Sequence, residues 1–367
     1  MNEDRAARYH RLRRRASVGS ALAGVAWLAA LHVTGASAAL AGRAAATGQS
    51  LPWILRRPLA VVLFIGILAL GSELVSLPFV FYRAFLLERK YGLSSEHLST
   101  WLQDHLKALA LGLALALAAG LAVFAAIGVA GDAWWIVAAG LFAVAALLIS
   151  RIAPVLLMPL FYRFRPLERA ALRERLLTLS RRAGVPVVGA FEWGLGEKTT
   201  RANAALVGVG RTRRILVSDT LLKDYSDDEI EVILAHELAH HVHHDIWTAL
   251  AVETLVVTAA LYAAHAAASR AGVAASLGAL PLMILVAGGV SFLLTPLANA
   301  WSRHNERRAD RFALALTGRP ADFITAMRRL GAQNLAEERP STPVLWFFHT
   351  HPTIDERIAA AKEFRAA

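Results

Sequence analysis

The chain has 367 residues, of which 56% are hydrophobic and only 18% are charged. An ordinary soluble domain carries about 25% charged residues, so this composition argues against a cytosolic globular protein and excludes a disordered chain. The absence of cysteine excludes disulfide bonds, a cysteine-ligated metal and a thiol nucleophile. The net charge of +11 is typical of the basic loops of a membrane protein. We therefore predict a membrane protein with no nucleic-acid partner.

Six apolar segments approach the roughly 20 residues that a helix needs to cross a bilayer. They lie at 18–40, 58–81, 108–131, 133–157, 246–268 and 276–300. Lysine and arginine are abundant at the N-terminus and in 82–107, 158–245 and 301–367, which predicts that these parts face the cytoplasm. The basic start, the apolar stretch 21–33 and the triplet Ala36-Ser-Ala38 also resemble a signal peptide, so cleavage of the first segment stays an open alternative.

Between the fourth and fifth apolar segments lies a stretch with mixed periodicity. Residues 167–183 predict an amphipathic helix, and the runs 203–209 and 214–218 predict a β-hairpin. The expected fold class is an all-α polytopic membrane protein with a small α+β cytoplasmic metallopeptidase domain. Along the chain we expect a membrane region with four spans (1–157), a cytoplasmic region with the hairpin (158–245), a transmembrane hairpin (246–300) and a cytoplasmic C-terminal region (301–367).

A metal-binding motif follows the predicted hairpin. Ser226 and Glu229 form a capping-box pattern, which predicts that a helix begins there. This helix carries His236 and His240 four residues apart, hence on one face, where two imidazoles can bind one zinc ion. Glu237 stands beside them as the predicted base for the attacking water.

A catalytic zinc needs a third protein ligand and an open position. A third histidine at the spacing H-E-x-x-H-x-x-G-x-x-H is excluded, because the chain has His243 and Ile246 at those two positions. The candidate is Glu306, which lies beyond two predicted spans and thus on the same side of the membrane as His240. Asp310, one helical turn further on, can accept the ring N–H of a ligating histidine.

From about residue 74 onward, the chain resembles the type I CAAX prenyl endopeptidase family. The motifs that carry the resemblance are Leu77-Pro78, Glu88-Arg-Lys-Tyr-Gly92, Ile152-Ala-Pro154, 159–167, Asn203-Ala-Ala, 218–222, 236–244, Glu306-x-x-x-Asp310 and His351-Pro352. The resemblance implies a helical bundle around an intramembrane chamber, one zinc ion on its cytoplasmic side and removal of three residues after a prenylated cysteine. Eukaryotic members have seven spans, against the six counted here.

The resemblance also extends the list of expected site residues. It implies that His351 donates to the oxyanion that develops during catalysis, with Arg357 beyond it as a substrate-binding candidate. The segment Asn203, Ala204 and Ala205 suits an edge strand that binds an extended peptide by strand addition, and the matching family segment lies beside the active site. An ordinary strand in a small sheet is the alternative interpretation of that segment.

Several interpretations of substrate and setting stay open. The substrate is a peptide or protein, either prenylated at its C-terminus or, in a quality-control protease, not lipidated. Glu237 disfavours a non-catalytic membrane scaffold, because a purely structural zinc site does not need a base. A site-two-type protease is disfavoured because the sequence lacks the L-D-G-like motif whose Asp supplies the third ligand in such proteases. Abundant arginine and alanine with scarce lysine suggest a bacterial genome, and hence the bacterial inner membrane rather than the endoplasmic reticulum. The sequence does not predict an oligomeric state.

Overall fold

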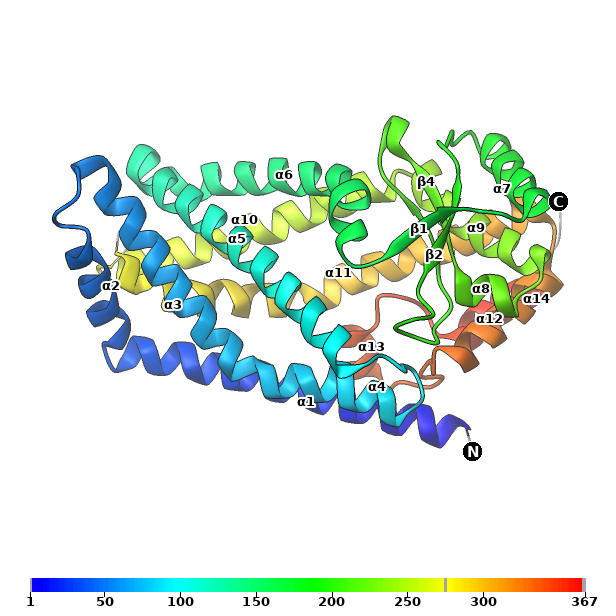
Figure 1. The fold of residues 1–367 in the computed structure, drawn as a ribbon, viewed down its shortest axis with the longest axis horizontal. Coiled ribbons are helices and arrows are strands. Elements are labelled where there is room, and N and C mark those ends of the chain that lie inside the picture. The colour runs from blue at the N-terminus through cyan, green and yellow to red at the C-terminus, as the bar shows by residue number, and fades with distance from the viewer. Residues whose placement is uncertain (1, 274–275, 365–367) are drawn as a thin grey trace.

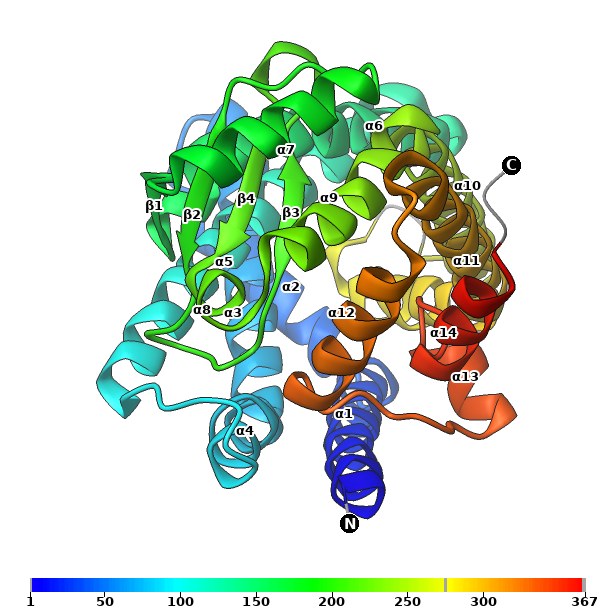
Figure 2. The same cartoon turned by 90° about the vertical axis from the view of Figure 1, so that its right-hand side faces the viewer.

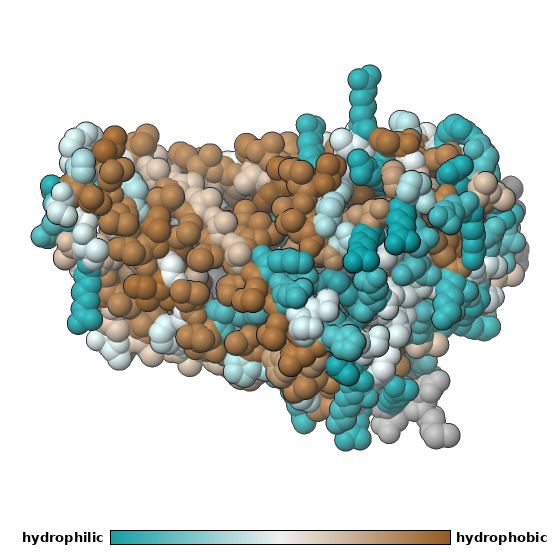
Figure 3. All heavy atoms as spheres, in the orientation of Figure 1, coloured by the Kyte–Doolittle hydropathy of each residue, from teal (hydrophilic) through white to brown (hydrophobic). Residues whose placement is uncertain are grey.

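The computed structural model describes residues 2–273 and 276–364. Long helices form one end of the molecule, and a small sheet with shorter helices forms the other (Figure 1). On the face shown in Figure 3, hydrophobic side chains cover most of the long-helix end, and the sheet end is mainly polar. This separation is what a protein with one part in a bilayer and one part in water requires.

In the described part of the chain, five helical stretches are long and apolar enough to cross a membrane: Arg5–Val33, Trp53–Lys90, Leu98–Leu160, Asp245–Arg270 and Leu277–Thr317. The longest contains two helices, which meet at the turn Gly131–Ala133. The six segments expected from the sequence therefore fall on α1 (Asn2–Val33), α3 (Trp53–Phe81), α5 (Leu98–Ala130), α6 (Trp134–Ile152), α10 (Asp245–Arg270) and α11 (Leu280–Thr317). The chain is a multi-pass membrane protein.

The first of these segments ends earlier than the sequence suggests. Gly35 adopts the left-handed conformation, with φ of 73°, and the chain then turns into the short helix α2 (Ala36–Thr47). Glycine adopts such a conformation without steric cost, so the apolar run 18–40 is divided between two helices. A second short helix, α4 (Leu87–Lys90), follows α3.

The polar end is built on a four-stranded sheet. Its strands are β1 (Arg163–Pro166), β2 (Ala190–Gly194), β3 (Ala204–Val207) and β4 (Arg214–Ser218), in the order β1-β2-β4-β3. The β3–β4 pair is antiparallel, which confirms the predicted hairpin, whereas β2 and β4 are parallel. This order leaves β3 at an edge of the sheet, next to α9 (Asp227–Val242) (Figure 2).

Buried apolar side chains hold the helices of this end against the sheet. One core cluster includes Leu172 and Leu176 of α7 (Ala170–Arg182), Ile215 of β4, Ile230 of α9 and Phe323 of α12 (Pro320–Gln333). The remaining helices are α8 (Asp219–Asp224), α13 (Thr342–Phe348) and α14 (Ile354–Glu363). The helix α9 is thus fixed from several sides, which gives the motif that it carries a rigid base.

The two ends are joined by continuous or nearly continuous helices. After α9 the chain turns at His244, a non-glycine residue in the left-handed conformation with φ of 58°, and enters α10 directly. The helices α10 and α11 pack as a hairpin, and α11 also packs against α9. α11 is one helix of 38 residues that contains both a membrane-spanning stretch and Glu306.

Candidate metal centre

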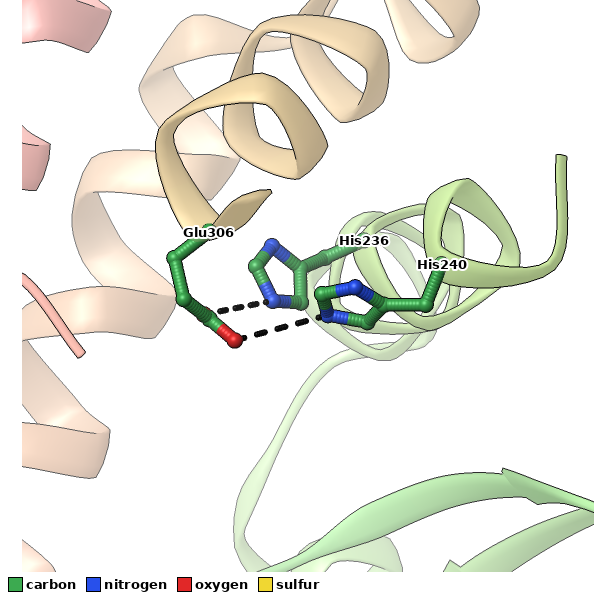
Figure 4. A group of neighbouring side chains, drawn as sticks. All are labelled: His236, His240 and Glu306. Carbon is green, nitrogen blue, oxygen red and sulfur yellow. Dashed lines mark ion pairs between the residues drawn. The ribbon is translucent and has the colours of Figure 1, made fainter. Parts of the chain in front are cut away.

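The three predicted ligands come together from two helices. His236 and His240 lie on α9, whose predicted capping box is present: Ser226 and Glu229 bond each other's backbone N–H groups at the start of the helix. Glu306 reaches them from α11 (Figure 4). One possible ligand atom from each of the three residues lies within 4.8 Å of the others.

The distances from the two histidines to Glu306 are close to those between ligands of a tetrahedral metal. The Nε2 atom of His236 lies 3.2 Å from Oε2 of Glu306, and Nε2 of His240 lies 3.5 Å from Oε1. Ligands at about 2.0–2.2 Å from a tetrahedral zinc are about 3.3–3.6 Å apart. Two imidazoles and one carboxylate are also a donor set known for catalytic zinc, so the residues present fit such an ion.

Each histidine is oriented by a carboxylate on its other ring nitrogen. Nδ1 of His236 lies 2.8 Å from Oδ1 of Asp310, as the sequence predicts. Nδ1 of His240 lies 2.9 Å from Oδ2 of Asp245, a residue that the sequence interpretation missed. Such carboxylates fix the tautomer and direct Nε2 toward the metal. The available signal for Asp245 was an acidic residue at the end of the motif helix, five positions after His240.

Arginine side chains hold these two carboxylates in turn. Arg357 of α14 donates to both oxygens of Asp310, with Nε–Oδ2 at 2.9 Å and Nη2–Oδ1 at 2.6 Å. Arg308 donates to Asp245. Burial opposes the charge on Arg357, but Asp310, Glu306 and Glu237 outweigh it and raise the pKa of the guanidinium, which therefore stays charged. Arg357, expected as a substrate-binding residue, is thus bonded to Asp310, and its Nη2 atom also lies 3.3 Å from Nδ1 of His236.

A cleft of about 400 Å³ opens beside the three ligands. Its lining includes six of the predicted site residues: Asn203, Ala204, His236, Glu237, His351 and Arg357. Burial raises the pKa of the Glu237 carboxyl, while His236 and His240 act in the opposite direction. Ala205 lies in β3 opposite Leu216 of β4, so its place is inside the sheet pairing. A larger cavity, of about 630 Å³ between α1, α12 and α14, has none of the predicted site residues in its lining.

His351 enters the site from the loop that follows α13. Its Nδ1 atom lies 2.8 Å from Oε2 of Glu306, although its side chain is 63% exposed. Arg303, one turn before Glu306 on α11, donates to the carbonyls of Leu345 and His349 and so holds the end of α13. Sequence reasoning missed Arg303, because its partners lie more than 40 residues away.

Comparison with known proteins assigns the family. Residues 166–365 match the model of peptidase family M48, and residues 2–163 match a model described as the CAAX prenyl protease N-terminal region with five membrane helices. CAAX prenyl protease 1 of Saccharomyces cerevisiae is 30% identical over 322 residues, covering 81% of this chain and 71% of that protein.

Two further similarities agree with this match. A Bacillus subtilis protein named uncharacterized metalloprotease YhfN is 29% identical over 317 residues, covering 84% of this chain and 74% of its own. The crystal structure of S. mikatae Ste24p has the same fold, with a TM-score of 0.82 at 23% identity, over 98% of this chain and 88% of that one. The chain belongs to peptidase family M48, and it is a membrane-embedded metalloprotease that acts on a peptide or protein substrate.

Proposed function

We propose that the metal is one zinc ion, held by His236, His240 and Glu306, and that the chain is an endopeptidase. The observation that carries the proposal is the convergence of these three side chains beside Glu237 in one cleft. When bound, a divalent metal at such a site polarises the scissile carbonyl and acidifies a water molecule. Asp310 and Asp245 keep the two imidazoles directed at the metal.

The protein side chains then supply the proton transfers and the hydrogen bonds. Glu237 accepts a proton from the attacking water and later delivers a proton to the leaving amine. His351 donates a hydrogen bond to the oxyanion that develops on the scissile carbonyl. The edge strand β3 holds the substrate backbone by strand addition at Ala204, while Asn203, just before the strand, contributes to the wall of the binding cleft; both residues line the cleft.

The proposed substrate is a protein with a prenylated cysteine near its C-terminus, from which the last three residues are removed. This rests on the likeness to CAAX prenyl protease 1 of yeast over most of both chains. The second candidate is a non-lipidated membrane protein, cleaved for quality control. It is favoured by the bacterial relative, which is about as similar and whose name carries no prenyl substrate. In both cases we propose that the site faces the cytoplasm, because the basic loops lie at the site end.

A matched pair of fluorescent peptides tests the proposal, one with a farnesylated cysteine before its last three residues and one without the lipid. Each is offered to the purified enzyme, to the chelated enzyme before and after zinc is restored, and to Glu237→Ala. Asp227→Asn, a partly exposed carboxylate at the start of the same helix, is the control.

We expect cleavage of the farnesylated peptide that needs zinc, survives in Asp227→Asn and is lost in Glu237→Ala. Equal cleavage of both peptides would replace the prenyl substrate with the quality-control one. Cleavage that persists in Glu237→Ala would refute the assignment of the base.

A further inference from the structure

Side chains occupy backbone hydrogen-bonding groups at both ends of the outer edge of β3. In an antiparallel strand the N–H and C=O groups of one residue point to the same side, and successive residues alternate. Asn203 points its groups toward β4, because its carbonyl accepts from the N–H of Ser218 and its own N–H donates to the Ser218 hydroxyl. Ala202, Ala204 and Leu206 therefore point theirs to the outer side, toward the cleft and α9.

Asn334 occupies the outer side of Ala202. Its Oδ1 atom accepts from the N–H of Ala202 at 3.2 Å, and its Nδ2 atom donates to the carbonyl of Ala202 at 3.3 Å. One amide side chain thus makes both hydrogen bonds that a residue of a neighbouring strand would make. The backbone of Asn334 is itself fixed at the end of α12, where its N–H donates to the carbonyl of Leu330.

His241 of α9 occupies a backbone carbonyl at the other end. Its Nε2 atom donates to the carbonyl of Leu206 at 3.1 Å. Ala204 lies between Ala202, whose two outward groups are both bonded, and Leu206, whose carbonyl is bonded. In the described part of the chain no hydrogen bond reaches the outer side of the peptide groups of Ala204. Ala204, Asn334 and Glu237 line the same cleft.

We propose that Asn334 is a positioning residue that ends the substrate-binding edge, so that Ala204 is the residue of this edge whose outward N–H and C=O are both open to an extended substrate. The inference rests on the proposed role of β3 in holding the substrate. It deepens that role by fixing the register of the substrate on the strand. The substrate has one full pairing position, at Ala204, and no equivalent position two residues away to which it could shift. It also means that the substrate leaves the strand on the Ala202 side, so a short extended segment is sufficient for binding.

Backbone methylation of the substrate tests this register directly. A methyl group on an amide nitrogen removes its hydrogen bond to the enzyme and leaves the side chain unchanged. We would place one N-methyl group at each position in turn in both peptides of the lipid pair. Binding to zinc-loaded Glu237→Ala, in which hydrolysis does not interfere, is measured by fluorescence polarisation. The same series is repeated with Asn334→Ala added.

Gln333→Ala is the matched control, because Gln333 is adjacent on α12 and tethers the same segment without touching the edge. Its Nε2 atom donates to the carbonyl of Thr200, and its Oε1 atom accepts from Tyr225. If Asn334 were only a general tether, Asn334→Ala and Gln333→Ala would give the same profile of peptide binding across the methylated positions. Thermal melting and zinc affinity show that each variant is folded.

With Asn334 present, we expect one sensitive amide, where methylation weakens binding by about tenfold, since a buried carbonyl of Ala204 is left without its donor. Asn334→Ala opens Ala202, so a second sensitive amide appears two residues from the first. Gln333→Ala keeps the single position.

The inference is overturned if the parent already has two sensitive positions, if Asn334→Ala has the same profile as the parent, or if neither unmethylated peptide binds. A wrong assignment of the prenylated substrate would give a different result. The lipidated and lipid-free peptides would then be cleaved or bound equally well, whatever their methylation profiles.

Discussion

Asp245 offers the sharpest test of how the metal centre is held. Its carboxylate is 6% exposed, lies 2.9 Å from Nδ1 of His240 and is paired with Arg308 of α11. Asp245→Ala removes the partner that orients His240 and leaves the Arg308 guanidinium without its anion. Losing such a partner lowers metal affinity by about 10- to 100-fold. At 1.4 kcal/mol for each tenfold change, this is about 1.4–2.8 kcal/mol of binding free energy.

Asp245→Asn separates hydrogen bonding from charge. The amide oxygen still accepts from Nδ1 of His240, but the bond loses the ionic contribution, which is worth about 1 kcal/mol. We therefore expect a loss of about fivefold in zinc affinity for this variant, between the parent and Asp245→Ala. A role of Asp245 in packing alone would make the isosteric Asp245→Asn indistinguishable from the parent.

The assay is a competition for zinc between each purified variant and a fluorescent chelator, with melting curves as the check on folding. Asp104→Asn is the control, because it breaks an ion pair with Lys198 at the sheet end, away from the ligands. We expect it to lower stability and leave zinc affinity unchanged. An intact Asp245→Ala that binds zinc as tightly as the parent would refute the orienting role.

Three other predictions concern the start of α9, the segment between α12 and α13, and the oxyanion. Ser226→Ala should lower the free energy of unfolding by about 1 kcal/mol, because the cap of α9 is lost. Ser341→Ala should not lower it, since the Ser341 side chain makes no cap bond to α13, and equal melting shifts of the two variants would contradict this. Burial raises the pKa of Glu337, but the Arg14 ion pair outweighs it and holds that pKa below its ordinary range. Its stabilisation is therefore present above that range and is lost as pH falls through the lowered pKa, so the melting difference between the parent and Glu337→Gln should shrink in acid; a difference that grows in acid would show the wrong sign. His351→Ala should lower kcat by about 100-fold with zinc affinity unchanged, and an equal loss of zinc affinity would identify it as a ligand instead.

Local patterns predicted the parts of the molecule that depend on neighbouring residues. The apolar segments, the capping box at Ser226 and the hairpin of β3 and β4 all follow from periodicity or short motifs. The convergence of Glu306 on the two histidines followed from topology, because two spans return the chain to the same side. Each of these features requires only the local sequence and the side of the membrane.

The residues that were missed depend on long-range docking. Asn334 meets Ala202 across 132 positions, and Arg303 meets the end of α13 more than 40 positions away. Asp245 is close to the motif in sequence, but it faces His240 only because His244 adopts a left-handed conformation. A residue other than glycine seldom adopts that conformation, so the sequence does not predict this turn. The four-part division of the chain stays a prediction, and its boundary at residue 300 falls inside α11.

The continuity of α11 links the metal centre mechanically to the membrane. Glu306 lies on the same helix as a membrane-spanning stretch, and the helix continues unbroken past Pro296 to Glu306. His240 lies on α9, which continues into the next spanning helix after a turn at His243 and His244. A relative shift of α10 and α11 would therefore change the 3.5 Å separation between His240 and Glu306, on which tetrahedral coordination depends. The Arg308–Asp245 pair connects these two helices beside the ligands, so the contacts that orient His240 also fix the spacing of the helices.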